Sequence, residues 1–178
     1  MPAIREGEFI DDMEAVPLSD KDIRRIAGPE SVILSYPSLA NYSSIVSSAV
    51  KGIALLYPQT PTWGHWVAVT MTPHNKTLYY FDSYGKPIDH YLKDGYTHYL
   101  SNLIDHAMQQ NLIKRVITNT KKLQSEKDGI ASCGRYAALR LIFRSLSNDE
   151  FIALISDVRG GGSVTDRNVS LLTALATI

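Results

Sequence analysis

The feature of this sequence that most constrains its fold is the stretch GHWVAVTMTPHNKTLYYFDSYG at residues 64–85. Its first half has an alternating pattern that contains several β-branched residues, and PHNK is typical of a turn. Its second half is rich in aromatic residues and ends with glycine. This pattern predicts two antiparallel strands joined by a short turn. His65 begins the first strand and Asp82 ends the second. Because the ends of neighbouring strands lie about 5 Å apart, we expect the imidazole and the carboxylate to be able to meet.

The segments around this hairpin predict several helices and two more strands. In the helix expected at residues 18–28, Ser19 suits the N-cap position and Gly28 the end. Residues 133–147 (CGRYAALRLIFRSLS) are apolar nearly all round, which is typical of a buried helix. The other expected elements are strands at 31–37 and 112–120, and helices at 39–52, 90–111, 148–158 and 166–178, while the apolar residues 53–59 stay unassigned.

Together these elements predict an α+β fold in which a small central mixed sheet is flanked by helices. The 178 residues, 44% of them hydrophobic, suggest one domain over residues 1–178, with the acidic residues 1–17 as an N-terminal arm.

Lys and Arg total 18, as do Asp and Glu, so the net charge of zero gives no support for nucleic-acid binding. The single cysteine excludes an internal disulfide and fits a reducing compartment. No stretch resembles a membrane span or a secretory signal, so we expect neither.

The single cysteine, Cys133, stands where the polar loop at 121–132 enters the apolar helix. The first N–H groups of a helix lack partners within the helix and the helix dipole places partial positive charge there, so this position stabilises a thiolate. Gly134 has no side chain to obstruct a carbonyl group that approaches the sulfur, and backbone N–H groups at this turn could form an oxyanion hole. A cysteine nucleophile needs a base and the base needs an orienting group, and His65 and Asp82 can fill these roles.

Each of these residues also has an ordinary explanation. A cysteine at a helix start is most often a small buried hydrophobe, a histidine before Trp66 can be a strand-edge residue, and Asp82 can cap a strand-ending turn. Their order favours the catalytic interpretation: Gly-His-Trp opens one strand, an acid ends the next, and a glutamine-containing loop leads to Ser-Cys-Gly. The histidines at 90, 98 and 106 do not share one helix face, so the sequence predicts no zinc site.

This combination resembles the adenain-like and ubiquitin-like-protein-protease superfamily of cysteine peptidases over about residues 60–145. The family motif is matched by His65-Trp66, Asp82, Gln124 and Cys133-Gly134. The compact chain, its opening LSDKDIRRI and the Tyr-Gly after the acid resemble the viral, adenain-like branch more than the cellular one. The N-terminal third and the last helix match weakly.

The resemblance implies a papain-like superfold in permuted order, with a Cys133–His65–Asp82 triad. It implies that the side-chain amide of Gln124 stabilises the oxyanion beside the backbone N–H of Cys133. Gln124 precedes the cysteine by nine residues, more than the family usually shows, so the loop must bulge or another residue must serve. Trp66 is expected to pack on the cysteine helix, and Trp66 and Gly134 to border the bound substrate.

The function that the resemblance implies is that of a cysteine endopeptidase, a viral maturation protease that cleaves structural precursor proteins at Gly-containing sites. Its partners would be polypeptides such as capsid precursors, with an activating peptide as a further candidate partner, and no cofactor or metal. It would work in the host cytoplasm or nucleus and in the virion.

Several alternatives remain open at this point. The closest is a deconjugating protease for ubiquitin-like modifiers, and a bacterial-effector-like acetyltransferase would keep the fold and change the chemistry. A chymotrypsin-like viral cysteine protease would be all-β, which the helical pattern after Cys133 disfavours. A catalytically inactive module that binds a Gly-Gly tail is the alternative outside the enzymes. The VRGGG stretch at 158–162 is interpreted as a flexible loop, with self-processing as the second interpretation.

Overall fold

The computed structural model describes residues 12–127, 130–156 and 165–176. Its centre is a five-stranded mixed sheet in the order β1-β2-β3-β4-β5. β2 pairs antiparallel with β3 and β3 with β4, while the outer strands β1 and β5 run parallel to their neighbours. The strands are β1 (Val32–Ser35), β2 (Ile53–Pro58), β3 (Gly64–Thr72), β4 (Thr77–Phe81) and β5 (Arg115–Thr118).

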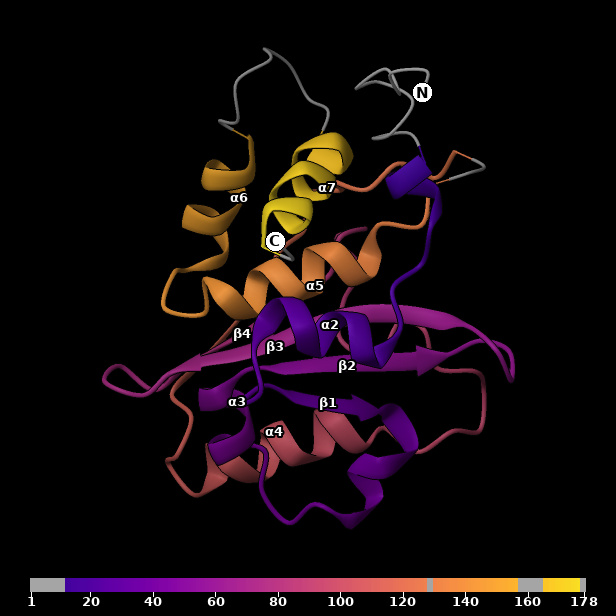
Figure 1. Cartoon of the computed structure of the whole chain (residues 1–178). Helices are drawn as coiled ribbons and strands as arrows, with labels where there is room; N and C mark the ends of the chain where they lie inside the picture. Colours follow the sequence, from indigo (N-terminus) through magenta and orange to yellow (C-terminus); the bar gives the residue numbers. More distant parts are fainter. Residues whose placement is uncertain (1–11, 128–129, 157–164, 177–178) are drawn as a thin grey trace, which may run out of the picture.

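Helices cover both faces of the sheet, as Figure 1 shows. On one face lie α2 (Asp20–Ala27), α5 (Cys133–Ile142), α6 (Asn148–Ser156) and α7 (Thr165–Leu175). On the other lie the 3₁₀ helix η1 (Tyr36–Asn41), α3 (Val46–Lys51) and α4 (Tyr99–Gln109). The α+β fold class predicted from the sequence, a central mixed sheet flanked by helices, is confirmed.

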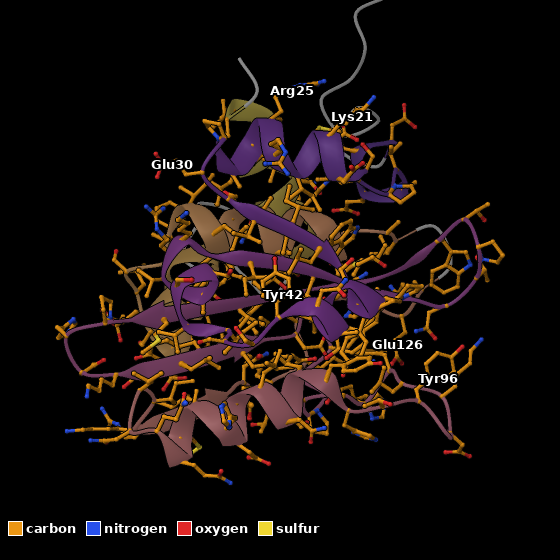
Figure 2. All side chains as sticks on the ribbon, turned by 90° about the horizontal axis from the view of Figure 1, so that it is seen from below. Lys21, Arg25, Glu30, Tyr42, Tyr96 and Glu126 are labelled. Carbon is orange, nitrogen blue, oxygen red and sulfur yellow. The ribbon has the colours of Figure 1, made fainter. Side chains whose placement is uncertain are left out.

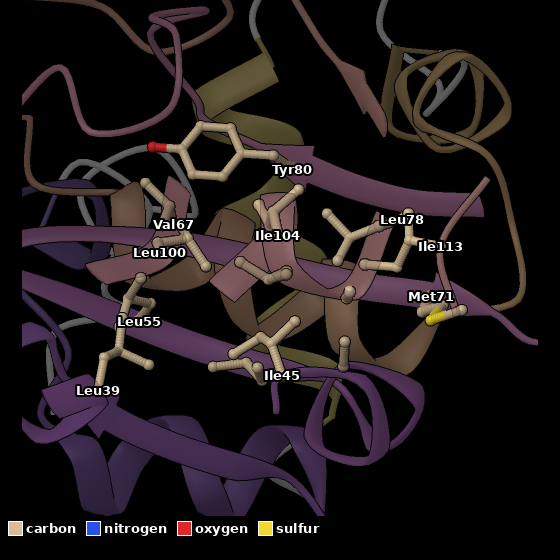
Figure 3. Packing of buried hydrophobic residues seen from close by; sticks show 14 of the residues in the cluster. Leu39, Ile45, Leu55, Val67, Met71, Leu78, Tyr80, Leu100, Ile104 and Ile113 are labelled. Carbon is tan, nitrogen blue, oxygen red and sulfur yellow. The ribbon is translucent and has the colours of Figure 1, made fainter. Parts of the chain in front are cut away.

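Each face of the sheet carries its own hydrophobic core because side chains alternate along a strand. In β3, Val67, Val69 and Met71 pack toward α3 and α4, whereas Trp66 and Ala68 pack toward α5. Figure 3 shows the first core, where side chains from the sheet meet those of α4 and the α3 region. With both faces covered, β3 and β4 are buried along nearly their whole length.

The hairpin and the first helix agree closely with the sequence-based expectations. Helix α2 begins with a capping box, in which the Ser19 N–H donates to the Asp22 carboxylate at 2.9 Å and the Asp22 N–H donates to the Ser19 hydroxyl at 3.3 Å. Gly28 ends the helix with a φ of +96°. Lys21 and Arg25 lie on the outer side of α2 (Figure 2).

The helix expected at residues 90–111 is wrong in its first part. Only Tyr99–Gln109 is helical, because residues 89–98 form successive turns in which Asp89 and Gly95 adopt positive φ angles of 62° and 84°. The expected helix at 39–52 is likewise divided between η1 and α3. The apolar residues left unassigned at 53–59 supply β2, which pairs with the hairpin.

Helix α5 is buried as expected but ends at Ile142 rather than at residue 147. A fully buried Arg140 explains this end. Its guanidinium donates to the carbonyl oxygens of Phe143 at 2.9 Å and Leu146 at 2.7 Å, so the chain after the helix wraps around the charge. Asn148 at the start of α6 accepts a further hydrogen bond from Arg140 Nε at 3.2 Å.

Candidate active site

A cleft of about 900 Å³ opens where β3 and α5 begin. His65, Gln124 and Cys133 all line it, although they come from a strand, a loop and a helix. Trp66 lines the same cleft, and Asp82 is completely buried behind His65. The structure thus brings together the residues that the sequence analysis singled out.

The buried carboxylate of Asp82 is held by a tight turn that follows β4. Its Oδ2 accepts hydrogen bonds from the backbone N–H of Lys86 at 2.9 Å and from the hydroxyl of Tyr91 at 2.6 Å. Its backbone is fixed by Asn119, which accepts from the Asp82 N–H at 2.9 Å and donates to the Asp82 carbonyl at 2.6 Å. Burial alone would raise the pKa of Asp82, but the hydrogen bond and charge of His65, with these other donors, lower it below its usual value, so the group is a carboxylate.

Gly85 makes this turn possible. It has a φ of +70°, and a Cβ at this position would lie 2.6 Å from the carbonyl oxygen of Thr120. Both the backbone conformation and the close approach therefore require glycine.

His65 lies between the acid and the thiol. Its Nε2 is 2.6 Å from Asp82 Oδ1, which leaves Nδ1 available for proton exchange with Cys133, which lines the same cleft. Burial would lower the pKa of His65, yet the hydrogen bonds and charges of Asp82 and Cys133 outweigh it and raise the pKa from 6.5 to about 9. The arrangement therefore favours an imidazolium paired with the Asp82 carboxylate.

Two tyrosine rings fix the plane of the imidazole. Tyr84 stacks on His65 with ring centroids 5.0 Å apart, and Tyr91 lies at 4.3 Å. Tyr91 thus contacts His65 with its ring and Asp82 with its hydroxyl.

Cys133 is the first residue of α5 and is partly exposed to the cleft. Position and exposure suit a thiolate that receives positive potential from the helix N-terminus. Gly134, which follows it, lies against other parts of the protein: a Cβ there would be 3.0 Å from Leu18 and 3.3 Å from Trp66. Trp66 thus packs on the cysteine helix as expected, and its Nε1 donates to the Leu18 carbonyl at 3.2 Å.

Gln124 reaches the same cleft despite its long spacing from Cys133. Its side chain is buried, and its Oε1 accepts a hydrogen bond from the Ser83 hydroxyl at 2.7 Å. The Ser83 carbonyl also accepts from the Gln124 N–H at 2.9 Å. Because the oxygen of the amide is engaged by Ser83, the amide nitrogen is the end suited to donate to a bound oxyanion.

Sequence reasoning assigned no role in the site to four residues that organise it: Ser83, Tyr84, Tyr91 and Asn119. Only Tyr84 had a signal, since it is the tyrosine of the Tyr-Gly that follows the acid. Tyr91 falls in the segment wrongly expected to be helical, and nothing in the local sequence distinguishes Asn119.

We also find no helix long and apolar enough to cross a membrane, and no group of three or more metal-ligating side chains, among the residues that the structure describes.

The fold and this site define the class of protein: a cysteine-protease type of hydrolase, with a helix-borne cysteine facing a strand-borne histidine. Comparison with known proteins gives the family, because residues 41–160, more than half of the chain, match the model of the adenovirus endoprotease family. The chain therefore belongs to the adenovirus endoprotease family, and the resemblance seen in the sequence is confirmed.

Individual proteins similar to this chain include the uncharacterized protein V9 of the Sputnik virophage. It is 30% identical over 168 residues, which cover 90% of this chain and 95% of that protein. The solved structures found include a de-sumoylating protease, with 12% identity, a TM-score of 0.39 and coverage of 95% of this chain and 78% of that one. Another is the C-terminal Ulp1 protease domain in complex with Smt3, the yeast orthologue of SUMO, with 12% identity, a TM-score of 0.38 and coverage of 97% and 82%.

Proposed function

We propose that this protein is a cysteine endopeptidase that works with a Cys133–His65–Asp82 triad. The observation that carries the proposal is the position of His65 in the cleft, with Nε2 2.6 Å from Asp82 Oδ1 and with Cys133 lining the same cleft. Such a constellation can activate a thiol and move its proton.

In the proposed reaction the Cys133 sulfur attacks the scissile carbonyl carbon and the electron pair of the C=O bond moves to oxygen. His65, protonated on Nδ1, donates this proton to the leaving amine as the C–N bond breaks and a thioester forms. Water then attacks the thioester, His65 takes its proton, and the sulfur leaves. Asp82 keeps the imidazole oriented and stabilises its positive form throughout.

The oxyanion of the tetrahedral intermediate is proposed to receive hydrogen bonds from the backbone N–H of Cys133 and the side-chain amide of Gln124. The engagement of Gln124 Oε1 by Ser83 at 2.7 Å supports this role, because it turns the amide nitrogen toward other acceptors. Trp66 borders the bound polypeptide in this proposal, as part of the cleft wall. Gly134, expected from the sequence to do the same, is buried against Leu18 and Trp66 and is not part of the cleft lining.

The proposed substrates are viral structural precursor proteins, cut at Gly-containing sites. The relation to a protein of the Sputnik virophage supports a viral role. A maturation protease of this kind acts in the host cytoplasm or nucleus and in the virion, needs no cofactor, and is a candidate for activation by a peptide.

The test is turnover of a fluorogenic peptide amide with two glycines before the leaving group, by the unmodified chain and by Cys133→Ala and His65→Ala. We expect both substitutions to lower kcat by at least about a thousandfold, since each removes a group that bonds to or protonates the reacting atoms. Intact substrate with bound peptide in the unmodified chain would instead support the Gly-Gly-tail binding module. Cleavage of a ubiquitin-like modifier precursor but of no capsid precursor would support the deconjugating protease.

A further inference from the structure

The loop between β5 and α5 carries both Gln124 and the residue before Cys133, yet its described residues form no helix or strand. Contacts with the rest of the protein must therefore hold it in place. Many of these contacts come from the first turn of α7. The match to the adenovirus endoprotease family ends at residue 160, so α7 lies outside it.

The central contact residue is Asp166, whose side chain is buried and accepts hydrogen bonds on both carboxylate oxygens. Oδ2 accepts from the backbone N–H of Ser125 at 2.8 Å, and Oδ1 accepts from the hydroxyl of Ser132 at 2.6 Å. Ser125 directly follows Gln124, and Ser132 directly precedes Cys133. One carboxylate is thus bonded to the neighbours of both proposed oxyanion donors.

The residues around Asp166 strengthen this attachment. The Tyr136 hydroxyl, one turn into α5, donates to Asp166 Oδ1 at 3.2 Å and also lies 2.8 Å from Thr165 Oγ1. Thr165 in turn donates to the Leu123 carbonyl at 2.7 Å. The first turn of α7 therefore bonds to the loop at two places, beside Gln124 and beside Cys133.

We infer that Asp166 is a positioning residue of the active site, which sets the Gln124 amide and the Cys133 N–H at the spacing that an oxyanion requires. The inference rests on the proposed function. It also answers the spacing problem seen in the sequence: the eight residues between Gln124 and Cys133 can present both donors to one cleft because a carboxylate bonds to the first and the last of them. Since an oxyanion hole acts on charge that develops in the transition state, misplacing its donors lowers kcat and changes substrate binding little.

The experiment compares Asp166→Ala with Asn168→Ala, a matched control on the same helix. Asn168 is also buried, but its side chain donates to the Ile155 carbonyl at 2.8 Å and so bonds α7 to α6 instead of to the loop. We measure kcat and KM on the fluorogenic Gly-Gly peptide amide, corrected for the folded fraction from urea unfolding. For Asp166→Ala we expect kcat to fall by about 10- to 100-fold with KM changed by less than about threefold.

The control should keep kcat within about threefold of the unmodified chain. Asp166→Asn should recover part of the lost kcat, because its amide oxygen can still accept from the Ser125 N–H while the Ser132 hydroxyl can turn to accept from the amide nitrogen. Equal kcat in the two alanine variants would overturn the inference and leave the proposed function intact, as would a loss confined to KM. Absence of turnover in the unmodified chain would overturn the proposed function and this inference with it.

Discussion

The raised pKa of His65 makes folding stability depend on pH in a way that Asp82→Asn should largely remove. In the unfolded chain the imidazole has a pKa of 6.5, and in the folded protein the pKa is about 9. A folded-state pKa above the unfolded value stabilises the protein fully below pH 6.5, and this contribution disappears as pH rises through 9. The difference corresponds to about 3 kcal/mol of unfolding free energy.

Asp82 itself does not contribute to the pH dependence within this window. Asp82 has a lowered folded-state pKa, so its own contribution is present above its unfolded pKa and is constant between pH 6 and pH 10. The hydrogen bond with Asp82 is the strongest influence that raises the pKa of His65, followed by that with Cys133. Replacing the carboxylate with an amide should therefore remove more than half of the pH-dependent contribution, about 2 kcal/mol.

The assay is urea unfolding followed by tryptophan fluorescence at pH 6 and pH 10. The quantity of interest is the loss of unfolding free energy between the two pH values, which should be about 2 kcal/mol smaller in Asp82→Asn than in the unmodified chain. Asp166→Asn is the control, because Asp166 is also a buried carboxylate but bonds to Ser125 and Ser132 instead of to a histidine. The same pH-dependent loss in all three proteins would refute the assignment of a charged His65–Asp82 pair.

Three further predictions concern groups that support the site. Tyr91→Phe removes a hydrogen bond of 2.6 Å to the Asp82 carboxylate, and urea unfolding should show a loss of about 2 kcal/mol. Ser83→Ala frees the Gln124 amide to rotate, so kcat on the Gly-Gly peptide should fall about tenfold at constant KM, and an unchanged kcat would contradict the proposed role of the amide. Gly85→Ala forces a Cβ to within 2.6 Å of a carbonyl oxygen at a φ of +70°, and thermal unfolding should show a loss of more than about 2 kcal/mol.

The hairpin and both ends of α2 could be predicted because their causes are local. Strand alternation and the turn sequence specify β3 and β4, and the Ser19 capping box with Gly28 specifies both ends of α2. The helix expected at 90–111 begins too early because its apolar spacing, from Tyr99 to Met108, does not mark where the helix starts. In the structure the buried Asp89 carboxylate accepts hydrogen bonds from Ser101 in the first turn of α4. Strand β2 has no alternation to reveal it, since helices cover both of its faces.

The residues of the candidate site fall into the same two groups: those whose position follows from the local sequence, and those that contact them from distant parts of the chain. His65, Asp82 and Cys133 have recognisable positions at element ends, which is why their chemistry could be inferred from the sequence. The groups that hold them come from elsewhere in the chain: Asn119 fixes the Asp82 backbone from 37 residues away, and Asp166 bonds to Ser132 from 34 residues away. No local pattern encodes such contacts.

This difference explains why the position of Gln124 was harder to predict from the sequence than the positions of His65, Asp82 and Cys133. The other proposed catalytic groups each sit on or beside a regular element, where backbone hydrogen bonds fix the direction of the side chain. Gln124 lies in a loop, so its direction depends on Ser83 at one side and, through Ser125, on Asp166 at the other. Its place in the cleft is therefore a property of the assembled fold, and variants of Ser83 and Asp166 should impair the oxyanion donors while leaving the His65–Asp82 pair intact.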